Sequence, residues 1–253
     1  MPPVATPAII LSTIRYGETS KIARLATREL GVQSAIAKGA LRPKSRFGAA
    51  LHLLSEGHAT LYLARSSDLH TLVQFEPVAV RIGLAKRLDR FAAASLLAEL
   101  MLKFAPAGPH QPSYDLFRDA LAVLEAAPGD AVEVVGLRCL WRLVSVLGFA
   151  PSLERCAREG AALASDRAAF FSPGDGGFLC DTCGAGMSGS RLLPADRADL
   201  AALLEPAAEL PFLDPAHLAA HRRLFDRWVR QQLGDGGVLP ALAFWLDRRW
   251  AAA

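Results

Sequence analysis

The chain has few residues of the kinds that mark secreted or membrane-spanning proteins. Only four of its 253 residues are cysteine, and in a cytosolic chain close pairs among them indicate metal binding or chance before they indicate disulfides. No apolar run approaches the roughly 20 residues that cross a bilayer. The N-terminal sequence also lacks the basic and then apolar regions of a signal peptide. We therefore expect a cytoplasmic protein that contacts no membrane.

Motifs of common enzyme classes are missing as well. The sequence contains no G-x-S-x-G elbow, no Walker loop and no carboxylate pair in a catalytic motif. His217 and His221 are four residues apart on an expected helix, a spacing that can bind metal, but no Glu accompanies them in an H-E-x-x-H pattern. Surface or capping histidines are the commoner interpretation. The sequence favours a binding protein and predicts no enzymatic activity.

Acidic residues are missing from residues 38–48, which hold four cations. Gly39, Pro43 and Gly48 prevent a continuous helix or a central strand here, so the cations should lie on a loop or a strand edge. Such a surface could meet an anionic partner, and the alternative is a solvated basic turn that only maintains solubility.

The excess positive charge lies in the N-terminal part. Residues 1–80 hold nine Lys or Arg against five acids, whereas the remainder holds 19 against 20. Within residues 15–46, eight cations accompany only Glu18 and Glu29. This distribution is typical of a nucleic-acid surface. The expected DNA-contacting residues are Lys38, Arg42, Lys44, Arg46, Arg15, Lys21 and Arg24.

Short apolar and β-branched segments between residues 7 and 76 predict about five strands with no helix among them. So few strands in roughly 70 residues fit a small closed barrel better than a sandwich. The expected strands are Ala8–Ile14, Ser20–Thr27, Val32–Lys38, Leu51–Ala64 and Leu69–Phe75.

After Glu76 and Pro77 the periodicity becomes helical. We expect an α+β protein with a barrel domain at residues 1–78, followed by an all-helical domain at residues 79–253. The expected helices are Arg81–Phe104, Ser113–Ala126, Ala131–Leu147, Pro194–Leu203, Pro215–Leu233 and Pro240–Trp250. Residues 150–190 are rich in Gly and poor in helical signal, which predicts an excursion from the helices.

This excursion contains Cys156, Cys180 and Cys183. The second C-x-x-C-G knuckle is intact, whereas Glu159 stands where the first knuckle would have a fourth thiolate. Three thiolates and Glu159 would close a tetrahedral structural zinc site. The alternative is a degenerate knuckle that packs without metal. Cys139 lies among apolar residues of a helix and is expected in the core.

The helix expected at Pro215–Leu233 interleaves aromatic and cationic residues. If it is exposed, it would suit an acidic peptide with hydrophobic anchors, because the cations attract the acids while an aromatic pocket holds the anchor. Ordinary core with solvated arginines is the alternative. The candidate partner-binding residues are Arg222, Arg223, Arg227, Trp228 and Arg230.

Four segments occur in an order that is characteristic of one family. They are residues 15–21, 37–48, 147–156 and 171–177, the last leading to Cys180. On these segments the chain resembles the bacterial RecO family of recombination mediators and DNA repair proteins over nearly its full length. The resemblance implies an N-terminal OB-fold and a helical domain with a zinc knuckle, although Glu159 departs from the four-cysteine pattern.

The resemblance also implies a role in DNA repair and homologous recombination at the nucleoid. Members bind single- and double-stranded DNA, anneal complementary strands, and act with RecR on single-strand-binding protein so that RecA can load. They bind the acidic, hydrophobic C-terminal tail of single-strand-binding protein on the helical domain.

The residues themselves agree with binding that ignores base sequence. Phosphate contacts give affinity without base readout. Stacking candidates are sparse, so electrostatics should dominate over stacking. These candidates are Tyr16, Phe47, Tyr62 and Phe75. Two other hypotheses stay open, namely an adaptor that does not contact DNA and a zinc-dependent hydrolase that uses the three knuckle cysteines.

Overall fold

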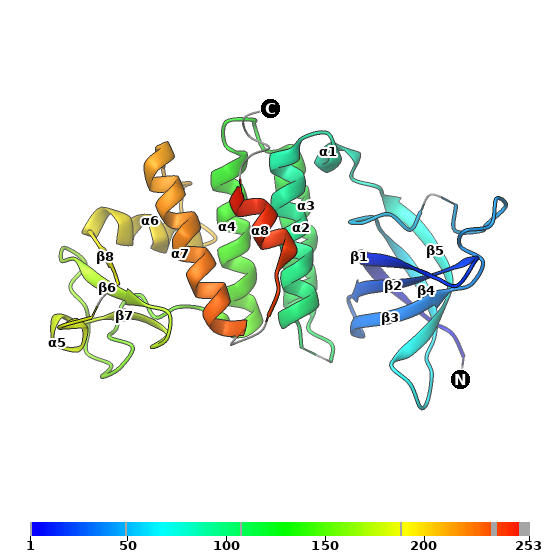
Figure 1. The fold of residues 1–253 in the computed structure, drawn as a ribbon, viewed down its shortest axis with the longest axis horizontal. Coiled ribbons are helices and arrows are strands. Elements are labelled where there is room, and N and C mark those ends of the chain that lie inside the picture. The colour runs from blue at the N-terminus through cyan, green and yellow to red at the C-terminus, as the bar shows by residue number, and fades with distance from the viewer. Residues whose placement is uncertain (1, 49, 107, 188, 234–236, 248–253) are drawn as a thin grey trace. The chain divides into compact units, whose positions relative to one another are not determined.

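A series of strands is followed by a series of helices in the computed structural model (Figure 1). The described chain divides into two compact units between Ala127 and Pro128. The boundary expected between residues 78 and 79 lies at the end of the last barrel strand and remains a prediction. The structure describes residues 2–48, 50–106, 108–187, 189–233 and 237–247.

The first unit begins with a closed barrel of five strands in the order β1-β2-β3-β5-β4. β3 and β5 pair in parallel and the other neighbouring strands pair antiparallel, with β1 closing the barrel against β4. This is the expected OB-fold, and the α+β class is confirmed. The strands are β1 Val4–Tyr16, β2 Ser20–Thr27, β3 Gly31–Ala37, β4 Glu56–Tyr62 and β5 Leu69–Ala79.

Successive residues of a strand point to opposite faces, so every second side chain enters the barrel. The side chains that fill the interior are both small and large. Ala23 and Leu25 of β2 are buried beside Ile10 of β1, while Arg24 between them is exposed. Phe47 reaches the same core from the segment between β3 and β4. This segment is therefore attached to the barrel at both of its ends.

The strand predicted at Leu51–Ala64 is shorter than expected and begins only at Glu56. Leu51 and Leu54 are buried in the core but do not pair in a β-ladder. Leu54 has a positive φ of 66° and its N–H donates to the Ile10 carbonyl at 2.8 Å. A buried turn thus has the composition of a strand.

The single helix predicted at Arg81–Phe104 is interrupted. Arg81 is left-handed with φ 49°, and Arg87 is extended with φ −134° and ψ 127°, so neither can continue a helix. The helices of the first unit are α1 Ile82–Ala85, α2 Leu88–Phe104 and α3 Gln111–Ala126.

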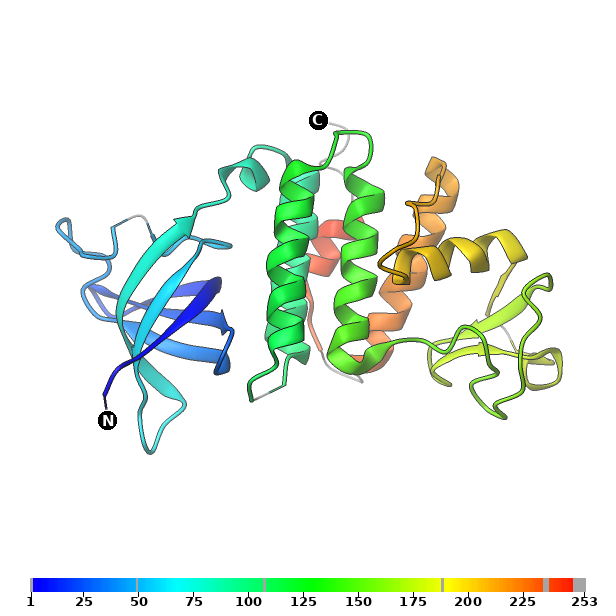
Figure 2. The ribbon, with the colours of Figure 1, turned by 180° about the vertical axis from the view of Figure 1, so that it is seen from behind.

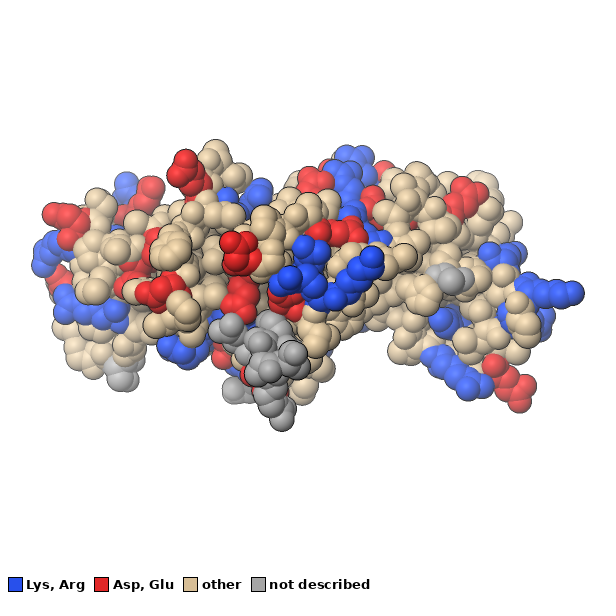
Figure 3. Space-filling model, turned by 90° about the horizontal axis from the view of Figure 1, so that it is seen from above, with Lys and Arg blue, Asp and Glu red and all other residues tan. Residues whose placement is uncertain are grey.

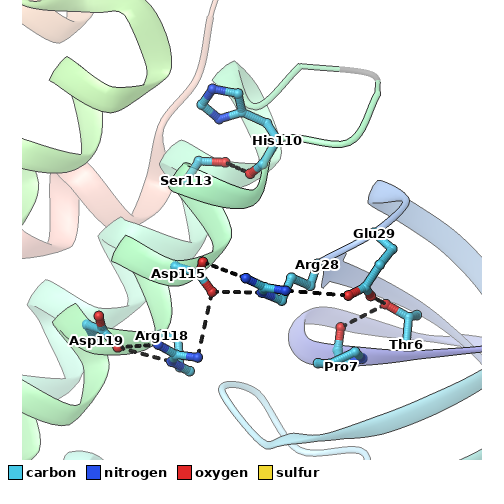
Figure 4. Close-up of polar contacts among 9 residues, drawn as sticks. All are labelled: Thr6, Pro7, Arg28, Glu29, His110, Ser113, Asp115, Arg118 and Asp119. Atoms are coloured by element: carbon cyan, nitrogen blue, oxygen red, sulfur yellow. Dashed lines mark hydrogen bonds and ion pairs between the residues drawn. The ribbon is translucent and has the colours of Figure 1, made fainter.

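An arginine fork joins the end of β2 to α3 (Figure 4). The Arg28 guanidinium donates Nε to Oδ1 and Nη2 to Oδ2 of Asp115 at 3.0 and 3.1 Å. These bonds from Arg28 hold the pKa of the Asp115 carboxyl below its usual value. Glu29 lies 3.8 Å from Arg28 and accepts from the Thr6 hydroxyl. The Arg28 side chain therefore has a structural role within the first unit, unlike the exposed cations of the loop after β3.

The second unit packs around Trp141. Its ring lies 5.0 Å from Phe225 and 6.2 Å from Trp228, measured between centroids. The helix predicted at Ala131–Leu147 ends in a π-helical turn, η1, in which Gly148 adopts φ 97°. The end of the helix predicted at Pro240–Trp250 lies outside the described residues. The helices are α4 Val132–Val144, η1 Ser145–Phe149, α6 Pro194–Leu204, α7 Pro215–Leu233 and α8 Pro240–Asp247.

The excursion between α4 and α6 forms a small antiparallel sheet in the order β7-β6-β8, which lies beside α6 (Figure 2). Its strands are three or four residues long, too short for alternation to be recognised in the sequence. They are β6 Ala169–Ser172, β7 Gly177–Leu179 and β8 Ser190–Leu192, with the one-turn helix α5 at Asp181–Gly184. Among the described helices, none has the length and apolar character needed to cross a membrane.

Candidate nucleic-acid interface and metal centre

Strand register brings several of the predicted cations together at one end of the barrel. Arg15 of β1 is opposite Lys21 of β2, and Lys21 is opposite Ala37 of β3, which precedes Lys38. The Leu41 N–H donates to the Thr19 carbonyl at 2.8 Å, so the loop after β3 lies against the β1–β2 turn. The basic end of the barrel, as we name it, comprises Arg15, Lys21, Lys38, Arg42, Lys44 and Arg46.

The loop that carries four of these cations is built from consecutive turns. Arg42 N–H donates to the Gly39 carbonyl at 3.1 Å, and Ser45 N–H donates to the Arg42 carbonyl at 3.0 Å. Gly39 has φ 71°, a conformation that glycine adopts without strain. The loop ends at the buried Phe47, over whose ring Arg46 lies 5.2 Å from the centroid. The turns and the buried Phe47 fix the backbone of the loop, and the cationic side chains are exposed to solvent.

The cations of this loop are exposed and uncompensated. Lys38, Arg42 and Lys44 make no ion pair with any described residue, and neither does Arg46. In Figure 3 the barrel lies at the right, where blue side chains project with few red atoms beside them. Such side chains need no carboxylate to be displaced before they can contact phosphate.

Arg24 lies on the outer wall of the barrel, because it is opposite Ser12 of β1 and Ser34 of β3. Of the four stacking candidates, Tyr16 and Tyr62 are about half exposed, at 51% and 49%. The other two, Phe47 and Phe75, are buried in the barrel core, so they cannot stack on bases. The structure thus leaves fewer aromatic platforms than the sequence suggested.

The three knuckle cysteines and Glu159 converge in the second unit. Their ligand atoms all lie within 4.8 Å of one another. The Cys180 thiol donates to Glu159 Oε1 at 2.9 Å, and the Cys183 N–H donates to Cys180 Sγ at 3.4 Å. Gly160, with φ 74°, closes the first turn by donating its N–H to the Cys156 carbonyl at 2.8 Å. These four residues form a cluster that can hold a metal ion.

Local hydrogen bonds favour a thiolate at Cys156. Burial opposes its ionisation, but backbone N–H groups of Cys180, Glu159 and Arg158 donate to the sulfur and lower its pKa to about 7. Burial and the neighbouring sulfurs raise the pKa of Cys183 to about 12, an effect that a dication would reverse. Tetrahedral sulfur ligands of zinc lie about 3.8 Å apart, given Zn–S bonds of about 2.3 Å. The cluster is compatible with that spacing.

Two of the predicted partner-binding residues are in the interior. Arg222 is 2% exposed, with its guanidinium carbon 3.9 Å from the Trp245 ring centroid and Nη1 3.9 Å from Glu133. Trp228 is also 2% exposed and donates Nε1–H to the Phe149 carbonyl at 3.0 Å. Neither side chain is available to a partner, because the aromatic stripe of α7 forms the core of this unit.

The other three arginines, Arg223, Arg227 and Arg230, are exposed. Arg223 and Arg227 line a hollow of about 370 Å³ together with Arg191 of β8. Arg230 is not part of that lining and pairs with Asp226 at 2.6 Å. Sequence reasoning missed Arg191, since nothing in the sequence indicates that β8 runs beside α7.

Two family models together match nearly the whole chain. "Recombination protein O N terminal" matches residues 1–81, and "Recombination protein O C terminal" matches residues 85–238.

Curated relatives agree with these matches over most of their length. A DNA repair protein RecO of Nocardioides sp. is 36% identical over 216 residues, covering 83% of this chain and 84% of the relative. That of Rubrobacter xylanophilus is 35% identical over 175 residues, 69% of each chain. That of Anaeromyxobacter sp. is 32% identical over 239 residues, 91% of this chain and 92% of the relative. The chain belongs to the RecO family of DNA repair proteins.

Proposed function

We propose that the chain is a recombination mediator that binds single- and double-stranded DNA without sequence specificity and anneals complementary strands. With RecR, it helps to load RecA onto DNA coated with single-strand-binding protein. The observation that carries this proposal is the basic end of the barrel, where exposed cations gather beside an OB-fold wall. Membership of the family supports the same role.

The chemistry of this surface suits annealing. Lysine and arginine contacts to phosphate are indifferent to base sequence, which is needed by a protein that acts at any site of damage. Two complementary strands repel each other through their phosphates, and a dense cationic surface reduces that repulsion with no covalent step. We expect such binding to weaken steeply as salt rises.

A strand-annealing assay tests the proposal. Complementary labelled strands are mixed with the full chain, with and without their cognate single-strand-binding protein. The mediator should accelerate pairing of bare and of coated strands. An adaptor that never contacts DNA predicts no acceleration of bare strands and no binding at moderate salt, and that result would reject the mediator role.

The hollow lined by Arg191, Arg223 and Arg227 is the site that we propose for the C-terminal tail of single-strand-binding protein. Its three arginines come from two elements and converge on one cavity, whose lining also includes Leu192 and Leu224. An acidic peptide with a hydrophobic end needs both kinds of contact.

Charge reversal at Arg227 should weaken binding of such a peptide about tenfold, because a guanidinium in the lining becomes a repelling carboxylate. Fluorescence anisotropy of a labelled tail peptide against Arg227→Glu measures the change. Arg230→Glu is the matched control, since it reverses the same charge on the same helix outside the hollow. Equal losses in both variants would mean that only the general charge of α7 matters.

We further propose that the cluster of three cysteines and Glu159 holds a structural zinc ion. Zinc would fix the two turns of the excursion, with three thiolates and one carboxylate as ligands. Arg158 donates Nε–H to Asp175 Oδ1 at 2.7 Å and Nη1–H to the Cys183 carbonyl at 3.0 Å. This cation partly offsets the negative charge that the ligand set would carry.

Glu159→Cys should tighten zinc binding, because it supplies the fourth thiolate of a common structural site, whereas Glu159→Ala should weaken it about tenfold or more. Competition with a chelating dye measures both affinities, and the thiolate absorption of the cobalt-substituted protein reports sulfur ligation. Cobalt binding without thiolate absorption would contradict this assignment.

A further inference from the structure

A second group of metal-ligating side chains lies between α6 and α7, away from the cysteine cluster. Asp196 and Asp199 project from one face of α6, three residues apart, and His221 comes from α7. Ligand atoms of the three residues all lie within 4.8 Å of one another. Asp196 and His221 line the same hollow as Arg223 and Arg227, but the proposed peptide contacts are made by the arginines and leucines of that hollow.

His221 is the feature that singles the group out. Its side chain is only 3% exposed, and neither ring nitrogen has a hydrogen-bond partner among the described residues. Buried polar atoms are nearly always satisfied, since an unmade hydrogen bond leaves the cost of desolvation uncompensated. A ligand is therefore expected at this ring.

The two carboxylates have no lysine or arginine partner among the described residues, and the nearest basic group to Asp196 is the imidazole of His217, 3.9 Å away. Asp196 is held in place by its Oδ2, which accepts the Leu193 N–H at 3.3 Å. Two partly desolvated carboxylates beside a neutral imidazole form an anionic site, and a dication would satisfy all three groups.

His217 stands next to this group, with Nε2 3.9 Å from Asp196 Oδ1. Its Nδ1 lies 2.7 Å from Asp214 Oδ2, so this carboxylate orients the ring. A histidine whose Nδ1–H donates to a carboxylate presents the lone pair of Nε2, an arrangement that recurs around metal ions. His217 therefore lies beside the group, whose ligand atoms come from Asp196, Asp199 and His221.

We propose that Asp196, Asp199 and His221 bind a divalent transition-metal ion that links α6 to α7. Imidazole nitrogen with carboxylate oxygens suits Zn²⁺ or Mn²⁺, and it lacks the soft sulfur of the cysteine cluster. The hollow of about 370 Å³ includes Asp196 and His221 in its lining, which gives the ion a path from solvent.

Manganese is the probe that separates this site from the cysteine cluster, because Mn²⁺ prefers oxygen and nitrogen to thiolate. Electron paramagnetic resonance of free Mn²⁺ measures its binding to the full chain. We expect a single Mn²⁺ per wild-type chain, and affinity at least about tenfold weaker in Asp199→Asn and in His221→Gln. Asp226→Asn, which changes an aspartate of α7 paired with Arg230, should bind as wild type does.

Two results would overturn the proposal: no Mn²⁺ bound by the wild type, or unchanged affinity in Asp199→Asn. A buried water in place of the ion predicts the first of these. A second measurement needs no substitution. Paramagnetic Mn²⁺ should broaden the imidazole resonances of His221 and His217 in the wild-type chain before those of His52 and His58 in the barrel, and uniform broadening would reject the site.

Discussion

Replacing Arg42, Lys44 and Arg46 with alanine should lower the affinity of the full chain for single-stranded DNA by about 100-fold at about 0.1 M salt. Each phosphate contact to a single strand contributes about 0.7 to the slope of log affinity against log salt. Three lost contacts therefore remove about 2.1 from that slope, which corresponds to this loss at about 0.1 M. Titrations of a labelled strand at several salt concentrations measure both quantities.

The matched control replaces three exposed cations of the same unit, Lys86, Arg87 and Lys103, and so changes the net charge equally. It should retain most of the affinity and the slope, because none of these cations belongs to the basic end of the barrel. Equal losses in the two triple variants would mean that total charge, and not this loop, determines binding. An unchanged slope in the loop variant would remove the loop from the interface.

Arg81→Met should destabilise the first unit by at most about 3–5 kcal/mol, the cost of breaking a fully buried pair, because the carboxylates that lose their cation are only partly buried. The Arg81 side chain is 8% exposed and pairs with Glu56 of β4 and, at 3.7 Å, with Glu125 of α3. Glu125 also accepts the Gly83 N–H at 2.8 Å, so this arginine joins the barrel to its helices. Urea unfolding of the full chain, followed by barrel and helix signals, measures the loss.

Arg118→Met serves as the control, because Arg118 of the same unit pairs with Asp119 and the two side chains are 39% and 61% exposed. Solvent and salt screen such a pair, and unfolding should hardly change. The double variant Arg81→Met with Glu56→Gln should be no less stable than Arg81→Met alone, since it removes one stranded charge. A double variant much less stable than the single one would mean that Arg81 acts through packing.

The barrel was predictable because each strand carries its own signal. β2 runs at Ser20–Thr27 as predicted, with Ala23 and Leu25 buried on either side of the exposed Arg24. The sequence did not predict the local backbone geometry at Leu54 and Arg81, two non-glycine residues that adopt positive φ. Sequence patterns carry no mark of such residues, because tertiary contacts impose the conformation.

Some site residues could likewise be recognised in the sequence, and others could not. Cations in residues 38–48 were recognisable because they are adjacent in sequence and their glycines exclude regular structure. Trp228 was misleading, since an apolar stripe has the same composition whether it faces a partner or the core. Asp196 and Asp199 could not be associated with His221 at all, because only the packing of α6 against α7 brings them together.

The central claim is that DNA lies on the basic end of the barrel, and amide hydrogen exchange with and without a single strand tests it most directly. The account predicts slower exchange in residues 15–21 and 38–48 when DNA is bound, with no change in the cysteine-bearing excursion at residues 150–190. Protection confined to the helical unit, or none in the barrel under conditions where DNA binds, would contradict it.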